Sequence, residues 1–371
     1  MTLKIGILVS EPQLSDEVWR NVAQMALEEA QRREILDYDV EFIEERAEGL
    51  PTGTVQSVID AWKRLADRGV IAIVGPATAD NAMAIREVAD THQVATLSIT
   101  ATSYVASDWC FSISWGSGPE DSFRMVDYLK AQGCKSMGII WDTMWHSGEF
   151  VEFLGIAGKR AGIWTTCQER ISMRIREMGT PSDLQLRQAR IALENIRSTN
   201  PDGLAVATAL ATAAVGRVLK DMNWDIPVVC NNSLGIGRGP KAQGAMDGWV
   251  GTSIYDERNP IAARFLDEYV QRFGSVYHTD FQLTAHSAFR VLFEGLALAP
   301  IMTRRGVYEG LEKVRMFPSA LGSPGSYLGF GTHDHRALKG RGMIVLRRIL
   351  PGGGWERVPD IPYAAFEDEC P

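Results

Sequence analysis

Residues 70–90, VIAIVGPATADNAMAIREVAD, combine a short apolar run, a turn of small residues and a helical pattern. Open α/β sheets place ligands at the carboxyl ends of their strands, and the backbone N–H groups that open a helix favour negative charge. The turn GPATADN therefore predicts a place where a small molecule is held. It lacks the Lys-Ser/Thr pair of a P-loop, and the first strand and helix lack GxGxxG, so we expect no nucleotide there.

Catalytic and metal-binding patterns are missing from the sequence. It contains no GxSxG elbow, no HExxH and no kinase signature, and its five cysteines (Cys110, Cys134, Cys167, Cys230 and Cys370) form no CxxC pair. His333 and His335 in THDHR have a spacing that could ligate a metal, but no third ligand-rich segment accompanies them. We therefore expect a polar turn at THDHR, no metal, no cofactor and no enzyme activity.

Composition and charge narrow the possible partners. The chain has 371 residues, with 38 basic and 46 acidic side chains and a formal net charge of −8. The basic residues are scattered, whereas nucleic-acid binding needs a concentrated positive face, so we expect no nucleic-acid partner. No window of about 18 apolar residues occurs, which predicts no membrane span.

The amino-terminal sequence bears on localisation. MTLKIGILVS leads straight into a strand, without the basic start and apolar core of a secretory signal. We expect either a cytoplasmic protein or one whose signal peptide is missing from this sequence.

The elements that must position the turn alternate between β-rich runs and amphipathic helices. Parallel strands need crossover connections, and helices of this length supply them. We therefore predict an α/β protein with two doubly wound parallel-sheet lobes. The expected strands are 3–10, 38–45, 70–75, 94–100, 136–142, 165–172, 203–208, 226–232, 248–255 and 342–349, with a weak one near Trp355. The expected helices begin at Ser15 or Asp16 and near Ser147, and span 54–67, 81–92, 121–132, 182–199, 211–222, 260–273, 280–298 and 305–314.

Several segments, in this order and spacing, resemble the type I periplasmic binding proteins across nearly the whole chain. They are KIGILVSE, VIAIVGPATADN, VATLSITATS, GCKSMGIIWD, NPDGLAVAT, NPIAARFLDEYVQRFG, TAHSAFRVLFEGLALA and FGTHDHR. The branch with the greatest similarity includes the leucine/isoleucine/valine-binding proteins of ABC transporters and the cytoplasmic amide sensors of amidase operons.

The resemblance implies two lobes joined by a three-strand hinge, which close on a ligand in the cleft between them. It places one lobe at residues 1–117 plus 250–325 and the other at 118–249 plus 326–371. The crossovers are expected near residues 115–119, 248–251 and 323–329. The implied function is a solute receptor that delivers a small organic ligand to a membrane permease, as a monomer or homodimer. The alternative is a cytoplasmic ligand sensor that controls a regulator.

The resemblance also implies ligand-binding residues. In the second turn, Ala101 would offer its backbone N–H and Thr102 its hydroxyl to a ligand carboxylate. In the first turn, Ala79 stands where the amino-acid binders place a serine, between Thr78 and Asp80. Further residues that the family's positions bring to the cleft are Tyr104, the aromatic position at Trp145 or His146, and Asn232, which replaces the glutamate that caps the ligand ammonium.

The replacement at Asn232 predicts a different kind of ligand from a standard amino acid. A buried ammonium without a carboxylate partner is heavily penalised. Glu11 could substitute as the acid, or could be an exposed cap of the first helix. We expect a neutral or singly charged molecule, in the range of amino acid-like compounds, amides and aromatic acids.

Overall fold

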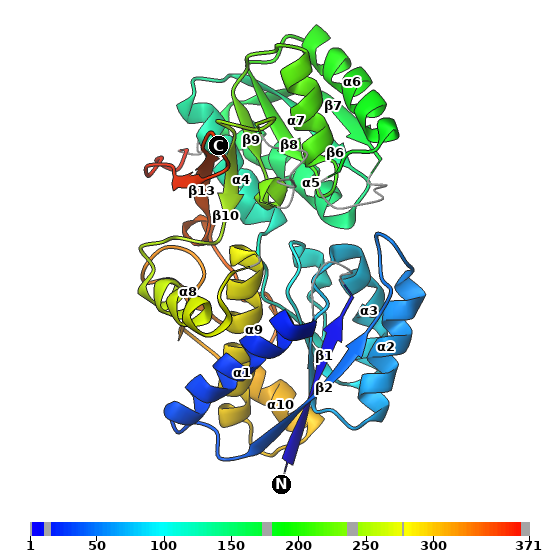
Figure 1. Cartoon of the computed structure of the whole chain (residues 1–371), viewed down its shortest axis with the longest axis vertical. Helices are drawn as coiled ribbons and strands as arrows, with labels where there is room; N and C mark the ends of the chain where they lie inside the picture. The colour runs from blue at the N-terminus through cyan, green and yellow to red at the C-terminus, as the bar shows by residue number, and fades with distance from the viewer. Residues whose placement is uncertain (1, 11–15, 173–179, 236–243, 277, 365–371) are drawn as a thin grey trace, which may run out of the picture. The chain divides into compact units, whose positions relative to one another are not determined.

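The computed structural model describes residues 2–10, 16–172, 180–235, 244–276 and 278–364. The chain folds into two compact units, each assembled from two stretches of sequence (Figure 1). Unit 1 comprises Met1–Trp115 and Ile254–Met343, and unit 2 comprises Gly116–Ser253 and Ile344–Pro371. The chain therefore passes between the units three times.

Two stretches belong to a different unit from the one that the sequence predicted. Residues 250–253 were expected in the first lobe, but β10 (Val250–Ser253) pairs with β9 (Val228–Cys230) in unit 2. Residues 326–343 were expected in the second lobe, but β12 (Tyr327–Leu328) pairs with β11 (Phe317–Pro318), and the His335 ring stacks on Phe111 in unit 1. The Gly/Pro/Ser-rich stretch after residue 321 is thus a turn inside unit 1, and the third passage lies at residues 343–344.

Unit 1 is built on a five-stranded sheet in the order β2-β1-β3-β4-β5, and all of its neighbouring strands are parallel. Helices α1 and α9 pack together on one face, and α2 and α3 on the other (Figure 1). Its strands are β1 (Thr2–Val9), β2 (Asp39–Arg46), β3 (Ala72–Val74), β4 (Ala95–Ser98) and β5 (Cys110–Ser112). Its helices are α1 (Asp16–Arg32), α2 (Val55–Asp67), α3 (Ala79–His92), α8 (Pro260–Phe273), α9 (Thr279–Leu298) and α10 (Arg304–Leu311), with short 3₁₀ turns η1 (Ser103–Val105) and η4 (Arg341–Met343).

Unit 2 has a seven-stranded sheet in the order β14-β13-β10-β9-β8-β6-β7. Strands β10, β9, β8, β6 and β7 are parallel, whereas β13 runs antiparallel to both of its neighbours. The remaining strands are β6 (Ser136–Asp142), β7 (Trp164–Ile171), β8 (Gly203–Ala207), β13 (Val345–Ile349) and β14 (Trp355–Arg357). The helices are α4 (Gly118–Ala131), α5 (Trp145–Ala161), α6 (Asp183–Ser198) and α7 (Thr212–Asp221), with the 3₁₀ turn η2 (Asn232–Leu234).

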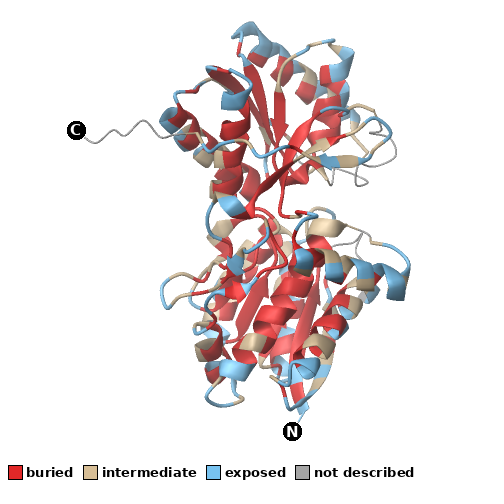
Figure 2. Cartoon of the chain, turned by 90° about the vertical axis from the view of Figure 1, so that its left-hand side faces the viewer, coloured by how far each residue is buried: buried red, intermediate tan, exposed pale blue. Residues whose placement is uncertain are grey.

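The period-two pattern of the strands divides the core of unit 2 between two faces. Ile140, Leu204 and Val206 pack with α6 and α7, whereas Ile139 and Ala205 pack with α4 and α5. These strands therefore contribute side chains to the apolar clusters on both faces of the sheet, as a doubly wound sheet requires. Figure 2 shows the result in both units: the central strands are buried, and exposed residues lie on the outer faces of the helices and in loops.

The predicted parallel α/β architecture is confirmed, with shifts at the ends of elements. Helix α4 begins at Gly118, three residues before the expected start, and short β5 was not predicted. Among the described residues, no helix is long and apolar enough to cross a membrane.

Candidate functional site

The two predicted turns of unit 1 lie side by side at the carboxyl edge of its sheet. They follow the neighbouring strands β3 and β4, and the Ile99 N–H donates to the Pro76 carbonyl at 3.3 Å. Gly75 has φ 104°, and a Cβ there would lie 2.3 Å from the Leu8 carbonyl oxygen. Only glycine therefore allows the first turn to pass so close to β1.

The first turn leads directly into α3. Thr78 is the extended residue before the helix, Ala79 is its first residue, and Asp80 lies in its first turn. A carboxylate is stabilised at a helix amino terminus. Asp80 thus already supplies negative charge where the family resemblance would place a ligand carboxylate.

Asn81 fixes the first turn, a role that the sequence analysis missed. Its side chain is fully buried. Its Oδ1 accepts from the Leu50 N–H at 2.9 Å, and its Nδ2 donates to Ser10 Oγ at 3.2 Å and to the Leu50 carbonyl at 3.1 Å. One amide therefore ties α3 to the loops after β1 and β2. Asn81 is the third residue of α3, and nothing in the sequence distinguished this amide from the other residues of the turn.

The second turn positions Thr102. Its side chain is fully buried, and its Oγ1 accepts from the Tyr104 N–H at 3.3 Å, which caps the turn η1. Ala101 is also buried, whereas Tyr104 is half-buried. The structure therefore brings Thr78, Ala79, Asp80, Ala101, Thr102 and Tyr104 to one edge of unit 1.

In unit 2 the corresponding edge is organised by Asp142 at the end of β6. Its Oδ2 accepts from the N–H groups of Ala209 and Leu210 at 2.7 and 2.9 Å. Its Oδ1 accepts from Ser147 Oγ at 2.7 Å and from the Met144 N–H at 3.2 Å. This buried carboxylate joins the loop after β8 to the start of α5. The sequence analysis did not single it out.

His146 and Asn232 lie in turns at this edge, after β6 and β9. His146 is in the first turn of α5, and burial lowers the pKa of its imidazole although the Asp142 charge opposes this. Both side chains are buried, and His146 Nε2 and Asn232 Oδ1 have no hydrogen-bond partner among the described residues. Trp145, next to His146, is 53% exposed.

A buried acidic group surrounds the start of α4. The Ser117 hydroxyl donates to Glu120, and the Ser117 N–H donates to Asp121 Oδ2 at 2.6 Å. Glu149 of α5 lies against Gly118, where a Cβ would be 2.4 Å from its Cγ. All three carboxylates are buried and each has interaction partners. The helix amino terminus contributes to stabilising their charge.

Other predicted residues lie away from these edges. Glu11 lies outside the described residues, as does Cys370. His335 is buried against Phe111, its Nδ1 donates to the Ser107 carbonyl at 2.7 Å, and its Nε2 lies 3.4 Å from Glu312. Within the described residues, no group of three His, Cys, Asp or Glu side chains is arranged to hold a metal. His335 therefore holds a turn in place.

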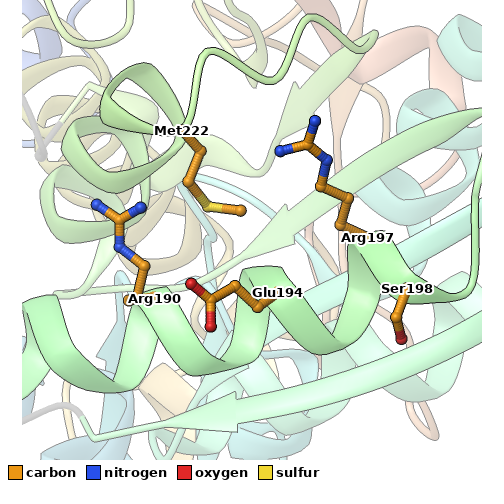
Figure 3. A pocket seen from close by; sticks show the side chains of 5 residues that line it. All are labelled: Arg190, Glu194, Arg197, Ser198 and Met222. Carbon is orange, nitrogen blue, oxygen red and sulfur yellow. The ribbon is translucent and has the colours of Figure 1, made fainter.

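A surface hollow of about 430 Å³ lies on helices α6 and α7 of unit 2 (Figure 3). It is shallow and open, and none of the residues predicted to bind ligand lines it. Its lining residues lie on α6 from the middle of the helix to its carboxyl end and directly after α7, so it lies nearer the opposite edge of the sheet from Asp142. They are Arg190, Glu194, Arg197, Ser198 and Met222.

Comparisons with known proteins agree with this architecture. A fold like this one occurs in a leucine-binding protein from Thermotoga maritima, with TM-score 0.75, 17% identity, and coverage of 97% of this chain and 98% of that one. A type 1 periplasmic binding protein from Bordetella pertussis gives TM-score 0.79 at 18% identity, with 97% and 100% coverage. An ABC transporter substrate-binding protein from Desulfitobacterium hafniense, in complex with Leu, gives 0.78 at 14%, with 96% and 100% coverage.

These identities show that the fold is shared and leave the ligand open. A search of curated proteins finds no match. A family model for periplasmic binding proteins matches residues 2–347. This range includes the sheet of unit 1, the sheet of unit 2 as far as β13, and the turns after β3, β4, β6 and β9. The chain belongs to the periplasmic binding protein family.

Proposed function

We propose that this protein is the solute-binding receptor of an ABC transporter, which binds a small organic molecule and delivers it to a membrane permease without chemical change. The supporting observation is the family match over residues 2–347, combined with buried polar turns at the carboxyl edge of each sheet. Solved proteins of this fold include ABC transporter substrate-binding proteins. Because such a receptor works on the outer side of the permease, we also propose that the protein is periplasmic.

The proposed ligand contacts come from both units. Unit 1 contributes the two turns with Thr78, Ala79, Asp80, Ala101, Thr102 and Tyr104. Unit 2 contributes Trp145, His146 and Asn232. Asp80 at the start of α3 and the absence of a carboxylate at position 232 argue against a standard amino acid. We therefore propose an amino acid-like compound, an amide or an aromatic acid, and expect weak binding of leucine, isoleucine and valine.

Thermal-shift screening of the whole chain tests this function. The panel should hold amino acids, amides, aromatic acids and polyols, since a compound that binds only the folded state raises the melting temperature. We expect a saturable shift with at least one small organic compound, and calorimetry should give one site. Steady turnover of the bound compound would contradict the receptor function, as would the absence of any binding across the panel. Submicromolar affinity for leucine would contradict the expectation that Asn232, which carries no charge, disfavours a ligand with an ammonium group.

A further inference from the structure

Helix α6 covers one face of the sheet of unit 2 beside β7, and its outer side exposes apolar side chains (Figure 1). The buried residues of its inner side are Gln185, Ala189, Ala192, Leu193 and Ile196. Leu184 and Ile191 lie on the outer side and are 39% and 59% exposed. They are seven residues apart, and Ser198 follows after seven more, so the three side chains form one line along the helix. Such a line on the solvent side of a helix is typical of a surface that packs against another helix.

Trp164 extends this apolar surface beyond the carboxyl end of α6. It is the first residue of the edge strand β7 and is 60% exposed. It pairs with Ser136, which lies on the same face of β6 as Ile140, and Ile140 packs with α6 and α7. Two residues along β7, Thr166 Oγ1 accepts at 2.8 Å from the hydroxyl of Thr199, directly after α6. Trp164 and the last turn of α6 therefore lie on the same side of the sheet.

Polar side chains flank the line in two pairs with the same spacing of seven residues. Arg187 and Glu194 are exposed and lie towards α7, where Glu194 lines the hollow. Gln188 and Asn195 lie towards β7, where Asn195 donates to Glu169 at 3.0 Å. Within the described residues, neither Arg187 nor Glu194 has an ion-pair partner. One flank thus carries a basic and an acidic group, and the other carries two amides.

The other two arginines of α6 have partners in their own chain. Arg190 Nη2 lies 3.9 Å from Asp221 Oδ2, and the Arg197 guanidinium lies over the Trp224 ring at 5.8 Å. Of these three arginines, Arg187 is therefore the one that remains for another molecule.

From this pattern we infer that α6 is the contact surface for a second copy of this chain, which lies antiparallel to the first across a two-fold axis at Ile191. A closed two-fold contact uses the same surface on both copies, so residues equally distant from the axis must fit each other. Along the central line, Ile191 meets Ile191 of the second copy. Leu184 meets Ser198 of the second copy, next to its Trp164. The exposed apolar side chains of both copies are thereby covered.

The two flanks fit the same arrangement. Arg187 lies opposite Glu194 of the second copy, and Glu194 lies opposite its Arg187, so opposite charges meet twice. On the other flank, Gln188 and Asn195 of the two copies lie opposite each other, and amides both donate and accept hydrogen bonds. A parallel copy would place Arg187 on Arg187 and Glu194 on Glu194. Charge therefore selects the antiparallel dimer.

Sedimentation velocity on the whole chain measures this dimer. One helix face is a small interface, so we expect a weak dimer, with a mean mass that rises with protein concentration from 40.9 kDa towards twice that value. Arg187→Glu and Glu194→Arg each place like charges across the axis and should weaken the dimer at least about tenfold. The double change Arg187→Glu/Glu194→Arg restores opposite charges in reverse order and should recover the dimer.

Arg217→Glu is the matched control, because it makes the same change of charge at an exposed residue of α7, outside the line. It should leave the dimer unchanged, and circular dichroism checks that every variant folds. A chain that stays monomeric at every concentration would overturn the inference. So would a dimer that both single changes leave intact, or one that the double change does not restore.

The substitution Ile191→Cys tests the position of the axis. A residue on a two-fold axis faces its own copy, so mild oxidation should give a disulfide-linked dimer. Ile301→Cys, at a similarly exposed isoleucine of unit 1, should give none. The unchanged chain, oxidised alongside, shows any cross-linking by its own five cysteines. A dimer in solution without cross-linking of Ile191→Cys would overturn the contact at α6.

Discussion

Thr102 is a buried side chain that supports the fold and that we propose also contacts the ligand. Its oxygen accepts from the Tyr104 N–H, so the hydroxyl is held in a defined place at the start of η1. Asn81 and Asp142 act differently, because their hydrogen bonds go to the protein and shape the turns around them.

Replacing the Thr102 hydroxyl should weaken ligand binding. Thr102→Ala removes the proposed hydrogen bond to a ligand oxygen, with an expected loss of about 0.5–1.5 kcal/mol for a neutral partner and more for a charged one. Calorimetry with the best compound from the screen measures this. Thr102→Ser keeps the hydroxyl and should retain most of the affinity. Unchanged affinity in Thr102→Ala would show that the hydroxyl does not contact the ligand.

Asp142 holds the loop after β6 and the loop after β8 together by accepting hydrogen bonds from both. Asp142→Asn replaces one acceptor oxygen by an NH₂ group, which must then face N–H or O–H donors. We expect the free energy of unfolding to fall by about 2 kcal/mol or more, because buried donors lose their acceptor. Urea denaturation measures it. Asp221→Asn, at an exposed aspartate of α7, should change stability by less than about 0.5 kcal/mol. Equal effects of the two changes would contradict the role of Asp142.

The start of α6 offers a prediction that is independent of the ligand. Ser182 and Gln185 form a capping box: Ser182 Oγ accepts from the Gln185 N–H at 3.2 Å, and Gln185 Oε1 accepts from the Ser182 N–H at 3.1 Å. Ser182→Ala should lower the free energy of unfolding by about 1 kcal/mol. Ser198→Ala, at the other end of the helix, serves as the matched control and should have little effect in the same urea titration.

The sequence predicted most of these elements because hydrophobic period and capping residues are local signals. Helix 260–273 and strand 136–142 match the structure residue for residue. The sequence misplaced residues 326–343 because their unit is decided by distant partners, such as Phe111 under His335. The family resemblance pointed to His146 and Asn232, but the hydrogen bonds of Asp142 and Asn81 depend on tertiary contacts that no spacing in the sequence reveals.

A buried histidine makes the free energy of unfolding of the whole chain depend on pH. His286 of α9 stacks on Phe265 at 4.0 Å, and desolvation, reinforced by Arg290 and Arg32, holds its pKa well below the ordinary value. Glu29 Oε2 lies 3.7 Å from His286 Nε2. Both carboxylate oxygens of Glu29 accept from the Arg290 Nε–H at 3.0 Å. The folded protein therefore keeps His286 neutral.

A lowered histidine pKa means that the unfolded chain binds the proton more readily. Stability is then complete above the unfolded pKa of about 6.5 and falls as the pH drops below it, by up to about 1.4 kcal/mol per pH unit for each such group. We expect this decline in urea titrations between pH 7 and pH 5. His286→Gln should flatten the slope, whereas His333→Gln, at an exposed histidine, should not. The same slope in both variants would rule out His286 as a source of the pH dependence of stability.

The place of β13 in the sheet also has a consequence for biosynthesis. Unit 2 begins at Gly116, yet β13 (Val345–Ile349) covers the edge of β10 (Val250–Ser253) only after the second stretch of unit 1 has been made. A nascent chain therefore carries an open strand edge for almost a hundred residues of synthesis, and such edges invite pairing with other chains. Unit 1 is complete once Met343 has been made, before the last stretch of unit 2, although each unit is interrupted by a stretch of the other.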